Sequence, residues 1–600
     1  MSEIAVPQSF SIPENTSMAD SVFRHEKESP EFVPFERLVD GKWVPVTARQ
    51  FASEVRAVAK GLMASGIELG DRVAVLAATR YEWVLLDYAI WTAGGATVAI
   101  YETSSADQAQ WILEDSGTKL LIVENSGHVD TVREVAENAP TVREVLQIEP
   151  APGGKSAVDE LIARGAAVTD EQVEERRNSV TAESAATLIY TSGTTGRPKG
   201  VQLKHRHFAS ESAACGLALP DSMHEGQRTL LFIPMAHVFA RLISFAAFDS
   251  KVTVGHTSDL STLLDQFAVF KPNFILSVPR VFEKVYNSAK QKAYDGGKGK
   301  IFEKASDVAI EYSKALENGG PGLALKIQHF VFDKLVYGKL KAALGGNVTR
   351  AVSGGAALGA RLGHFFRGVG VTIYEGYGLT ETTGGIIMNT PAAQKIGTVG
   401  KPFNGCAAKI AEDGELLLKG PQVFDGYWQN DKATDEAIRD GWFHTGDIGA
   451  IDEDGFISIT GRKKELIVTA GGKNVAPAVL EDSLRAHPLI SQVIVVGDSK
   501  PFVGALITLD PEALPGWLER HNLPAGTTVA ELIKNPDLIA EIDEAVAETN
   551  KKVSKAESIR KYRILETDFS IESGELTPTL KLKRNIIHDK HGAEIAAIYN

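Results

Sequence analysis

Three scarcities narrow what this chain can be: it has few cysteines, too few basic residues to balance its acidic ones, and no uninterrupted apolar run. Cys215 and Cys406 are its only cysteines, so a disulfide framework and a cysteine-rich zinc site are excluded, and a reducing cytoplasm fits best. The formal net charge of -14 argues against nucleic acid as a partner, because phosphate backbones are bound by basic surfaces.

The sequence also shows no pattern typical of a membrane span or a secretory signal. The longest apolar stretch, residues 84–100, is interrupted by Asp87 and by the pair Gly94-Gly95, so we do not expect it to cross a bilayer. Residues 1–14 lack the cationic start and apolar stretch of a signal peptide. We therefore expect a cytoplasmic protein, and peripheral contact with the inner face of a membrane remains open.

Short apolar segments bounded by turn residues predict strands, and amphipathic segments between them predict helices. Thr47 with Gln50, and Ser105 with Gln108, form capping boxes that mark two helix starts. The strands expected from these patterns span residues 73–77, 119–123, 185–190, 229–233, 274–278, 349–352 and 371–374. This alternation favours parallel sheets with helices on both faces, so the expected fold class is α/β with stacked βα sheets.

Between about residues 280 and 345 the sequence changes to long, charged, helical segments, which predict an inserted helical lobe. Leu323, Ile327, Phe330 or Val331, and Leu335 form an apolar stripe against lysines. Three roles stay open for this lobe: it could wall an apolar tunnel, contact a membrane, or simply pack on a sheet.

The last third of the chain predicts two further units. Residues from about 400 to 461 show short strands with tight turns, which indicates a β-rich subdomain. Residues 462–600 predict a small mobile α+β domain, with a hinge at 461–464 where glycine and polar residues separate two hydrophobic segments. The large N-terminal domain is accordingly expected to span residues 1–461.

The most informative motif is residues 190–200, Tyr-Thr-Ser-Gly-Thr-Thr-Gly-Arg-Pro-Lys-Gly, which follows one of the expected strands. Its glycines let backbone N–H groups approach phosphate oxygens, while its hydroxyls donate hydrogen bonds and its cations add positive charge. The phosphate-binding residues expected here are Thr191, Ser192, Gly193, Thr194, Thr195, Gly196 and Lys199. We infer a site for the triphosphate of ATP.

This loop is not a Walker A motif, because Gly196 is followed by Arg197 and Pro198. The one Gly-Lys-Ser sequence in the chain, residues 154–156, has Glu149 where the first glycine of that motif would stand. We expect residues 154–156 to be a surface linker.

Four more motifs follow in order. They are Tyr-Glu-Gly-Tyr-Gly-Leu-Thr-Glu at 374–381, Trp-Phe-His-Thr-Gly-Asp at 442–447, Gly-Arg-Lys-Lys at 461–464 and Leu-Thr-Pro-Thr-Leu-Lys at 576–581. Together with the phosphate loop they resemble the adenylate-forming superfamily of acyl-CoA synthetases, peptide-synthetase adenylation domains and beetle luciferases. The resemblance spans about residues 45–590 and is particularly to bacterial long-chain-fatty-acid CoA ligases.

The resemblance implies a two-step reaction in which ATP activates a carboxylic acid to acyl-AMP and coenzyme A then takes the acyl group. Two anions must meet in the first step, so the site needs cations. The resemblance implies Mg²⁺ on Glu381, an α-phosphate contact from Thr380, and Lys581 between the substrate carboxylate and the α-phosphate. An ammonium about 4 Å from one negative charge gains roughly 4 kcal/mol at an effective dielectric near 20.

The resemblance also implies contacts to the rest of the nucleotide. Tyr377 would stack on adenine, Asp447 would accept hydrogen bonds from the ribose, and Arg462 would lie nearby; taken alone, Tyr377 would also suit core packing and Asp447 a turn cap. His237 would lie between the carboxylate and the acyl pocket, with a buried core histidine as the alternative. The other expected nucleotide contacts are Gly354, Gly355, Ala356, Glu375, Gly376 and Gly378.

For the second step the resemblance implies that the small domain turns at its hinge, on Lys463 or Lys464. The segment with Gly471, Gly472 and Lys473 would then pass the pantetheine arm of coenzyme A. The sequence departs from the family pattern in having Thr579-Leu580-Lys581 where relatives have Ser-Gly-Lys.

The substrate class follows less directly from the residues than the chemistry does. The helical insertion and residues 278–282 are similar to those of long-chain fatty acyl-CoA synthetases. The alternatives are a fatty acyl-AMP ligase that delivers to a carrier protein, a medium-chain or aryl acid CoA ligase, and an inactive binding protein. The expected partners are a fatty acid, ATP and coenzyme A, and a homodimer remains open.

Overall fold

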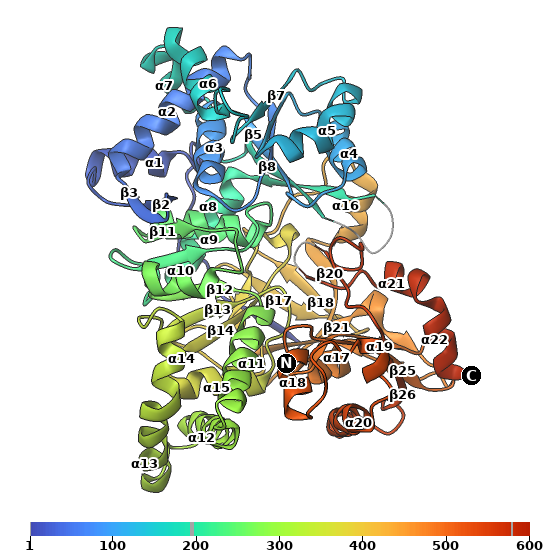
Figure 1. The fold of residues 1–600 in the computed structure, drawn as a ribbon. Coiled ribbons are helices and arrows are strands. Elements are labelled where there is room, and N and C mark those ends of the chain that lie inside the picture. Colours follow the sequence, from blue (N-terminus) through green and yellow to red (C-terminus); the bar gives the residue numbers. More distant parts are fainter. Residues whose placement is uncertain (1, 192–196, 578–579) are drawn as a thin grey trace.

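The first large unit of the fold is a six-stranded sheet of order β7-β6-β4-β5-β8-β9. The computed structural model describes residues 2–191, 197–577 and 580–600 (Figure 1). Five of the strands run parallel and β9 is antiparallel to β8. The strand bounds are β4 Arg72–Leu76, β5 Ala96–Ile100, β6 Leu120–Val123, β7 Glu144–Gln147, β8 Ala185–Thr191 and β9 Lys199–Lys204.

Helices cover both faces of this sheet, because its central strands β4, β5, β6 and β8 are apolar on both sides. Val73 and Val75 join the core cluster that contains α2 and α3, whereas Ala74 and Leu76 join the cluster that contains α4 and α5. Both expected capping boxes are present, at Thr47 before α2 and at Ser105 before α4. The helices of this region are α1 Asp20–Glu28, α2 Ala48–Ala64, α3 Tyr81–Thr92, α4 Ala106–Ser116, α5 Ser126–Asn138, α6 Ala157–Arg164 and α7 Asp170–Asn178. The predicted α/β class is confirmed.

A second five-stranded sheet, β12-β13-β14-β15-β16, carries parallel strands at one side and short antiparallel ones at the other. A smaller sheet, β10-β11-β2-β3, includes a hairpin from the start of the chain that the sequence patterns did not predict. The bounds are β2 Phe35–Val39, β3 Lys42–Val46, β10 Arg228–Leu231, β11 Thr253–His256, β12 Phe274–Ser277, β13 Arg350–Ser353, β14 Thr372–Tyr377, β15 Ile387–Met388 and β16 Lys401–Pro402. The helices near these sheets are α8 His205–Ala218, α9 Val238–Asp249, α10 Leu263–Phe270 and α15 Ala360–Val369.

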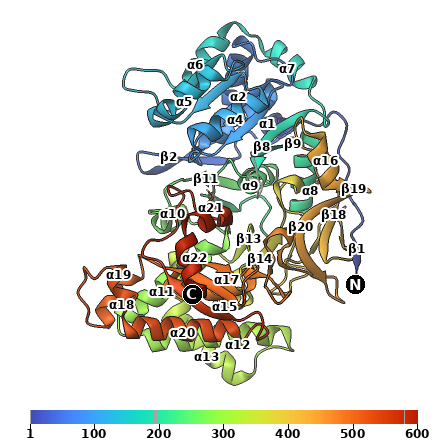
Figure 2. The ribbon, with the colours of Figure 1, turned by 90° about the vertical axis from the view of Figure 1, so that its right-hand side faces the viewer.

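The segment from Pro279 to Ala343 is helical, as expected for the inserted lobe, and lies at the lower end of the molecule in Figures 1 and 2. Its helices are α11 Pro279–Asp295, α12 Gly299–Glu317, α13 Leu323–Phe332 and α14 Gly338–Ala343, with a π-helical turn at Asp333–Tyr337 between the last two. α12 packs against α11, α13 and α15. The lobe therefore rests on the second sheet's helical layer.

A third sheet, β1-β17-β18-β20-β19 with β21 beside β20, forms most of the β-rich region. Its first strand comes from the chain's beginning, where Ile4 pairs with Ala408. That strand has three residues and no sequence signal of its own, because its partner lies some four hundred positions away. The bounds are β1 Glu3–Ala5, β17 Ala407–Ile410, β18 Glu415–Lys419, α16 Asp431–Ala437, β19 Ile438–Arg439, β20 Trp442–Ile451 and β21 Ile457–Arg462.

Residues beyond β21 build separate hydrophobic clusters around a three-stranded sheet, β24-β25-β26. No cluster among the described residues mixes side chains from before Ile457 with side chains from after Ile467. The elements are β22 Ile467–Val468, β23 Asn474–Val475, α17 Pro477–Arg485, β24 Ile490–Val496, β25 Val503–Leu509, α18 Leu514–Arg520, α19 Val529–Leu532, α20 Pro536–Asn550, β26 Ile559–Ile564, α21 Arg584–Lys590 and α22 Gly592–Tyr599. Figure 2 shows these elements in orange and red beside the helical lobe.

One buried ion pair connects the first sheet's layer to α9. Arg241 Nε and Nη2 donate to Asp87 at 3.0 and 2.6 Å, and Nη1 donates to Thr187 Oγ1 at 2.6 Å. Both charged side chains are 0% exposed. Burial raises the pKa of Asp87, and Arg241 opposes that rise. The pair thus holds together α3, β8 and α9, three elements from distant parts of the sequence.

We expect Arg241→Met to lower the free energy of unfolding by about 3 to 5 kcal/mol, because Asp87 would stay buried without its partner. Arg49→Met is the matched control: Arg49 pairs with Glu31 at 2.9 Å on the surface, and its loss should cost less than about 1 kcal/mol. Denaturant unfolding followed by tryptophan fluorescence measures both. Equal losses in the two variants would contradict the importance of the buried pair.

Candidate active site

The phosphate loop connects β8 to β9, which pair as an antiparallel hairpin. Thr191 and Lys199 lie opposite each other in the register, and so do Tyr190 and Gly200. The predicted contacts Ser192, Gly193, Thr194, Thr195 and Gly196 lie outside the described residues. The predicted strand before the loop is therefore present, and the loop begins at its carboxyl end.

The cations that end this loop face aromatic side chains. The Lys199 ammonium lies 5.0 Å from the centre of the Tyr427 ring, and the Tyr427 hydroxyl donates to Glu381 Oε1 at 2.8 Å. The Arg197 guanidinium lies 4.6 Å from the Trp111 ring centre. Lys199 and the predicted metal ligand Glu381 thus both contact Tyr427, the first at its ring and the second at its hydroxyl.

Three residues that the sequence patterns did not single out hold the loop in place. Trp111 Nε1 donates to the carbonyl of Pro198 at 2.9 Å, and Asp115 accepts from the hydroxyl of Tyr190 at 2.6 Å. Trp428 donates from its backbone N–H to Gly200 O and from Nε1 to Asp115 O. These side chains are ordinary helix and loop residues in sequence, so only the tertiary contacts identify them.

The Tyr-Glu-Gly-Tyr-Gly-Leu-Thr-Glu motif lies on the end of β14 and the short 3-10 turn after it. A Cβ atom at Gly378 would lie 1.4 Å from Gly384 O, so only glycine fits there. Thr380 begins the turn Thr380–Thr382 and is mostly buried. Glu375 accepts from the Leu358 N–H at 2.9 Å, and burial raises the pKa of Glu375 to about 7.

Tyr377, Asp447 and Arg462 form one connected group. The Tyr377 hydroxyl donates to Asp447 Oδ2 at 2.5 Å, and Arg462 Nε donates to Asp447 Oδ1 at 3.0 Å. Asp447 is 3% exposed. Asp447 lies on β20, and the N–H of its neighbour Gly446 donates to Glu415. The structure therefore brings together three residues that the sequence predicts around the nucleoside.

Gly354, Gly355 and Ala356 follow directly on the end of β13. A Cβ atom at Gly354 would lie 3.5 Å from the Phe239 ring and 3.8 Å from Gly376 O, so Gly354 lies beside the β14 motif. The hydroxyl of Ser353 is buried and has no hydrogen-bond partner among the residues described. An unpaired buried hydroxyl next to exposed glycine backbone fits a polar ligand at this edge.

His237 caps the start of α9, where its Nδ1 accepts from the Phe239 N–H at 3.1 Å. Thr79 holds the segment before His237 in place, because its hydroxyl donates to Ile233 O and accepts from the Met235 N–H. Burial, and then the positive charge of Lys581, lower the pKa of His237 to about 3. His237 is therefore neutral near pH 7 and lies within the electrostatic range of Lys581.

Lys581 lies in a tight loop where Leu580 has a positive φ of 61° and the Lys581 N–H donates to Thr577 Oγ1 at 3.0 Å. Its side chain meets solvent, yet protein surrounds it on most sides. Burial and the charge of Arg462 lower the pKa of Lys581, whereas Asp447 acts in the opposite sense. The C-terminal lysine thus lies within the electrostatic range of Arg462 and Asp447.

Two sets of contacts hold the C-terminal part in this position. At the hinge, Lys463 pairs with Asp413 and Glu415 of the β-rich region, while Lys464 is exposed and pairs with none of the described acidic residues. Across the interface, Arg280 donates to Ser491 Oγ at 3.2 Å and Lys284 pairs with Glu512 at 2.8 Å.

Gly471, Gly472 and Lys473 lie at the exposed tip of the β22-β23 hairpin, away from this group. Lys473 pairs with Glu557 at 3.5 Å, and Ala470 donates to Lys500 O, so the hairpin's contacts are within the C-terminal part. In this arrangement Lys581, and not the predicted coenzyme A segment, lies within the electrostatic range of Arg462 and Asp447.

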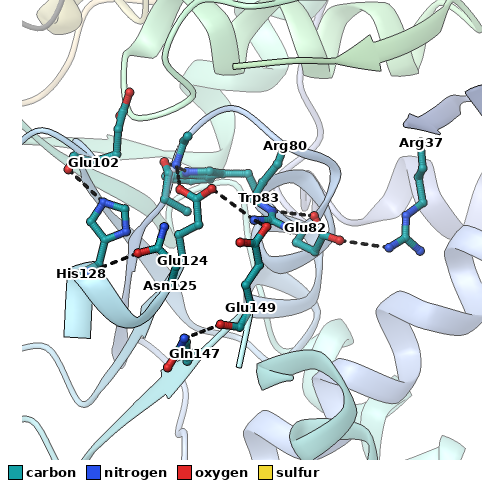
Figure 3. A network of polar contacts seen from close by, with 12 residues as sticks. Arg37, Arg80, Glu82, Trp83, Glu102, Glu124, Asn125, His128, Gln147 and Glu149 are labelled. Carbon is teal, nitrogen blue, oxygen red and sulfur yellow. Dashed lines mark hydrogen bonds and ion pairs between the residues drawn. The ribbon is translucent and has the colours of Figure 1, made fainter. Parts of the chain in front are cut away.

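Paired charged side chains occupy the carboxyl edge of the first sheet where β4, β6 and β7 end. Arg80, after β4, pairs with Glu82, Glu124 and Glu149 at 2.8, 3.2 and 2.7 Å. Figure 3 shows these side chains converging, with Arg37 on the far side of Glu82. Crevices at strand ends are common ligand sites in such sheets. In the first sheet, the edge beside β4 is therefore occupied by paired charges, whereas the phosphate loop begins at the end of β8.

Fold and site together define an enzyme of the adenylate-forming architecture. The structure of the A domain of carboxylic acid reductase from Segniliparus rugosus, in complex with AMP and a co-purified carboxylic acid, superposes with a TM-score of 0.76 at 21% identity, covering 98% of this chain and 94% of that one. This likeness concerns the fold.

The family models for AMP-binding enzyme and for AMP-binding enzyme C-terminal domain match residues 23–428 and 464–600, and the chain belongs to the AMP-binding enzyme family. Long-chain-fatty-acid–CoA ligase FadD15 of Mycobacterium bovis is 56% identical over 600 residues, covering 100% of both chains. Long-chain-fatty-acid–CoA ligase ACSBG2 of Gallus gallus is 32% identical, covering 93% of this chain and 78% of that one.

We expect Trp111→Phe to raise the KM for ATP about fivefold with little change in kcat, because it removes a hydrogen bond worth about 1 kcal/mol and keeps a ring beneath Arg197. Trp111→Leu removes both contacts and should raise the KM further. Steady-state AMP release at varied ATP concentration measures this. Trp43→Phe is the control, since the buried Trp43 indole N–H has no partner among the residues described. An unchanged KM for ATP in both Trp111 variants would contradict the anchoring role.

Proposed function

We propose that this enzyme activates a long-chain fatty acid with ATP to acyl-AMP, releases pyrophosphate, and then transfers the acyl group to coenzyme A with release of AMP. The first half of this proposal is supported by the bonded pair of Arg462 and Asp447 and by Lys581, which lies within the electrostatic range of that pair and of His237. The long-chain substrate is supported by the full-length relative that is 56% identical.

In the first step a carboxylate oxygen attacks the α-phosphorus, and the bond to pyrophosphate breaks. We assign Lys581 to screening the two negative groups, and Thr380 to holding the α-phosphate. A depressed pKa does not remove the charge of Lys581 once two anions are bound beside it, because opposite charges favour the protonated form. Neutral His237 adds no competing positive charge and can direct the carboxylate by a hydrogen bond.

The nucleoside is assigned to Tyr377, Asp447 and Arg462, with Gly354, Gly355, Ala356, Glu375, Gly376 and Gly378 as backbone contacts. Asp447 has both oxygens engaged, by Tyr377 and Arg462. Ribose hydroxyls would therefore meet a carboxylate already fixed in direction. We assign the triphosphate to the loop from Thr191 to Lys199.

Mg²⁺ fits Glu381, whose Oε1 accepts from Tyr427 and whose Oε2 has no partner among the residues described. No cluster of three acidic, histidine or cysteine side chains exists within the described ranges, which suits an ion that keeps waters and phosphate oxygens as most of its ligands. Bound there, Mg²⁺ would neutralise phosphate charge. Lys199, over the ring of Tyr427, would add to the same neutralisation.

For the second step we propose that residues 462–600 rotate as a small domain and bring Gly471, Gly472 and Lys473 to the site. Lys463 is tied to the β-rich region, so Lys464 is the residue free to change conformation as the pivot. The thiol sulfur of coenzyme A would attack the acyl carbon, and AMP would leave.

We also propose a cytoplasmic enzyme that meets the membrane only peripherally. Both cysteines are free and buried, which fits a reducing compartment. Long-chain fatty acids partition into bilayers, so contact with a membrane surface would bring the enzyme to its substrate.

A panel of free acids from about two to about twenty carbons, with benzoate included, tests the substrate class. We expect kcat/KM for AMP release to rise toward the long chains, because each buried CH₂ contributes about 0.8 kcal/mol to binding. AMP release should depend on coenzyme A. A maximum of kcat/KM at acetate or benzoate would contradict the long-chain assignment. AMP release that does not depend on coenzyme A would favour transfer to a carrier protein.

We expect Lys581→Ala to slow adenylate formation about a thousandfold, which corresponds to roughly 4 kcal/mol of lost charge stabilisation in the transition state. Thioester formation from supplied acyl-adenylate should remain near the wild-type rate. Pyrophosphate exchange measures the first step, and AMP release from acyl-adenylate plus coenzyme A measures the second. Lys583→Ala is the neighbouring control and should affect neither. Equal loss of both steps in Lys581→Ala would refute the assigned role.

A further inference from the structure

The outer face of α13 is an apolar stripe without a partner within the described part of the chain. No residue of α13 is fully buried. The stripe consists of five exposed side chains from α13 and the π-helical turn after it: Leu323 (75% exposed), Ile327 (57%), Phe330 (64%), Val331 (45%) and Leu335 (53%). Soluble surfaces seldom gather so many large apolar side chains on one short helix.

The opposite face anchors this helix, so the stripe is held outward. His329 stacks on Tyr312 at a centroid distance of 3.9 Å, and His329 Nε2 lies 2.6 Å from Gly368 O. Phe332 and Val336 pack against the main core. The exposure of the stripe is thus fixed by the fold on the inner side of the helix.

The charge around the stripe differs from that of the whole chain. Residues 321–346 contain four lysines and one acidic residue, Asp333, in a protein with a net charge of -14. Asp333 is paired with Lys341, which leaves Lys326, Lys334 and Lys339 exposed. The Lys334 ammonium lies 5.8 Å from the centre of the Phe330 ring, so it sits within the stripe. Such a surface is complementary to anionic lipid headgroups.

The position of α13 leaves it accessible. Both ribbon views place it at the lower end of the molecule, beyond α12 and α15 (Figures 1 and 2). No helix in the described ranges is long and apolar enough to span a bilayer.

We propose that the stripe docks α13 into the interface of a bilayer that contains anionic phospholipid, with Lys326, Lys334 and Lys339 at the headgroups and the apolar side chains below them. This inference deepens the peripheral membrane contact proposed above. A second copy of the chain is a poorer occupant, because a symmetric contact would set the same lysines against each other and lysine is depleted in protein interfaces.

Vesicle flotation of the ligand-free full-length protein tests the proposal. Vesicles of phosphatidylcholine with about one third phosphatidylglycerol should capture the wild type at least about tenfold better than pure phosphatidylcholine, and added salt should weaken the capture. The triple variant Ile327→Gln, Phe330→Gln, Leu335→Gln should lose about tenfold in capture. Lys326→Gln, Lys334→Gln, Lys339→Gln should lose the preference for the anionic vesicles.

The matched control replaces three exposed apolar residues elsewhere, Leu69→Gln, Leu217→Gln and Val269→Gln, which are 51%, 54% and 66% exposed. It should float like the wild type. Capture of the stripe variant at the wild-type level, or a change only in its oligomeric state by sedimentation velocity, would overturn the proposal. Pyrophosphate exchange with a water-soluble acid should be equal in all variants, so a failure of docking and a failure of the ligase assignment give different results.

Discussion

The structure depends most on the ion pair between Asp87 and Arg241, which lies wholly out of contact with water. Arg241 is one turn after His237 on α9, and its third nitrogen bonds Thr187 of β8. β8 leads into the phosphate loop, so this pair fixes the distance between the loop that would hold phosphates and the histidine near Lys581. Each buried charge would be strongly destabilising without the other. The pair therefore holds α3, β8 and α9 in one relative position.

In the candidate site, too, bonded partners hold the carboxylates in place, and these carboxylates are less buried than that of Asp87. Asp447 is fixed by Tyr377 and Arg462, and Glu381 is fixed by Tyr427. Asp447 has both oxygens bonded, whereas Glu381 has one oxygen bonded by Tyr427. Lys581 arrives from a different hydrophobic unit and remains accessible to solvent. A cation near the nucleotide residues suits a reaction between two negative groups, because it screens their repulsion.

Local patterns predicted much of this fold. The capping boxes at Thr47 and Ser105 and the central strands were found within one to three residues of their observed ends, because side-chain caps and buried strands are local features. The hairpin of β2 and β3 was missed although its two strands are neighbours in the sequence. The strand β1 was missed because its pairing partner lies far along the chain. Trp111 and Asp115 were missed for the same reason: a helix surface residue has no sequence signal for the loop it holds.

By itself the sequence determined the chemistry. Its motifs supply the phosphate loop, the carboxylates and the terminal lysine, because the reaction requires particular residue types that stand together in short segments. Only the tertiary structure decided which of two competing segments occupies the site. Lys581 lies within the electrostatic range of Asp447, Gly471 to Lys473 lie at an exposed hairpin tip, and ion pairs join the C-terminal part to α11 and to the β-rich region. Such pairs depend on the relative position of two separately packed units, a quantity that no local pattern encodes.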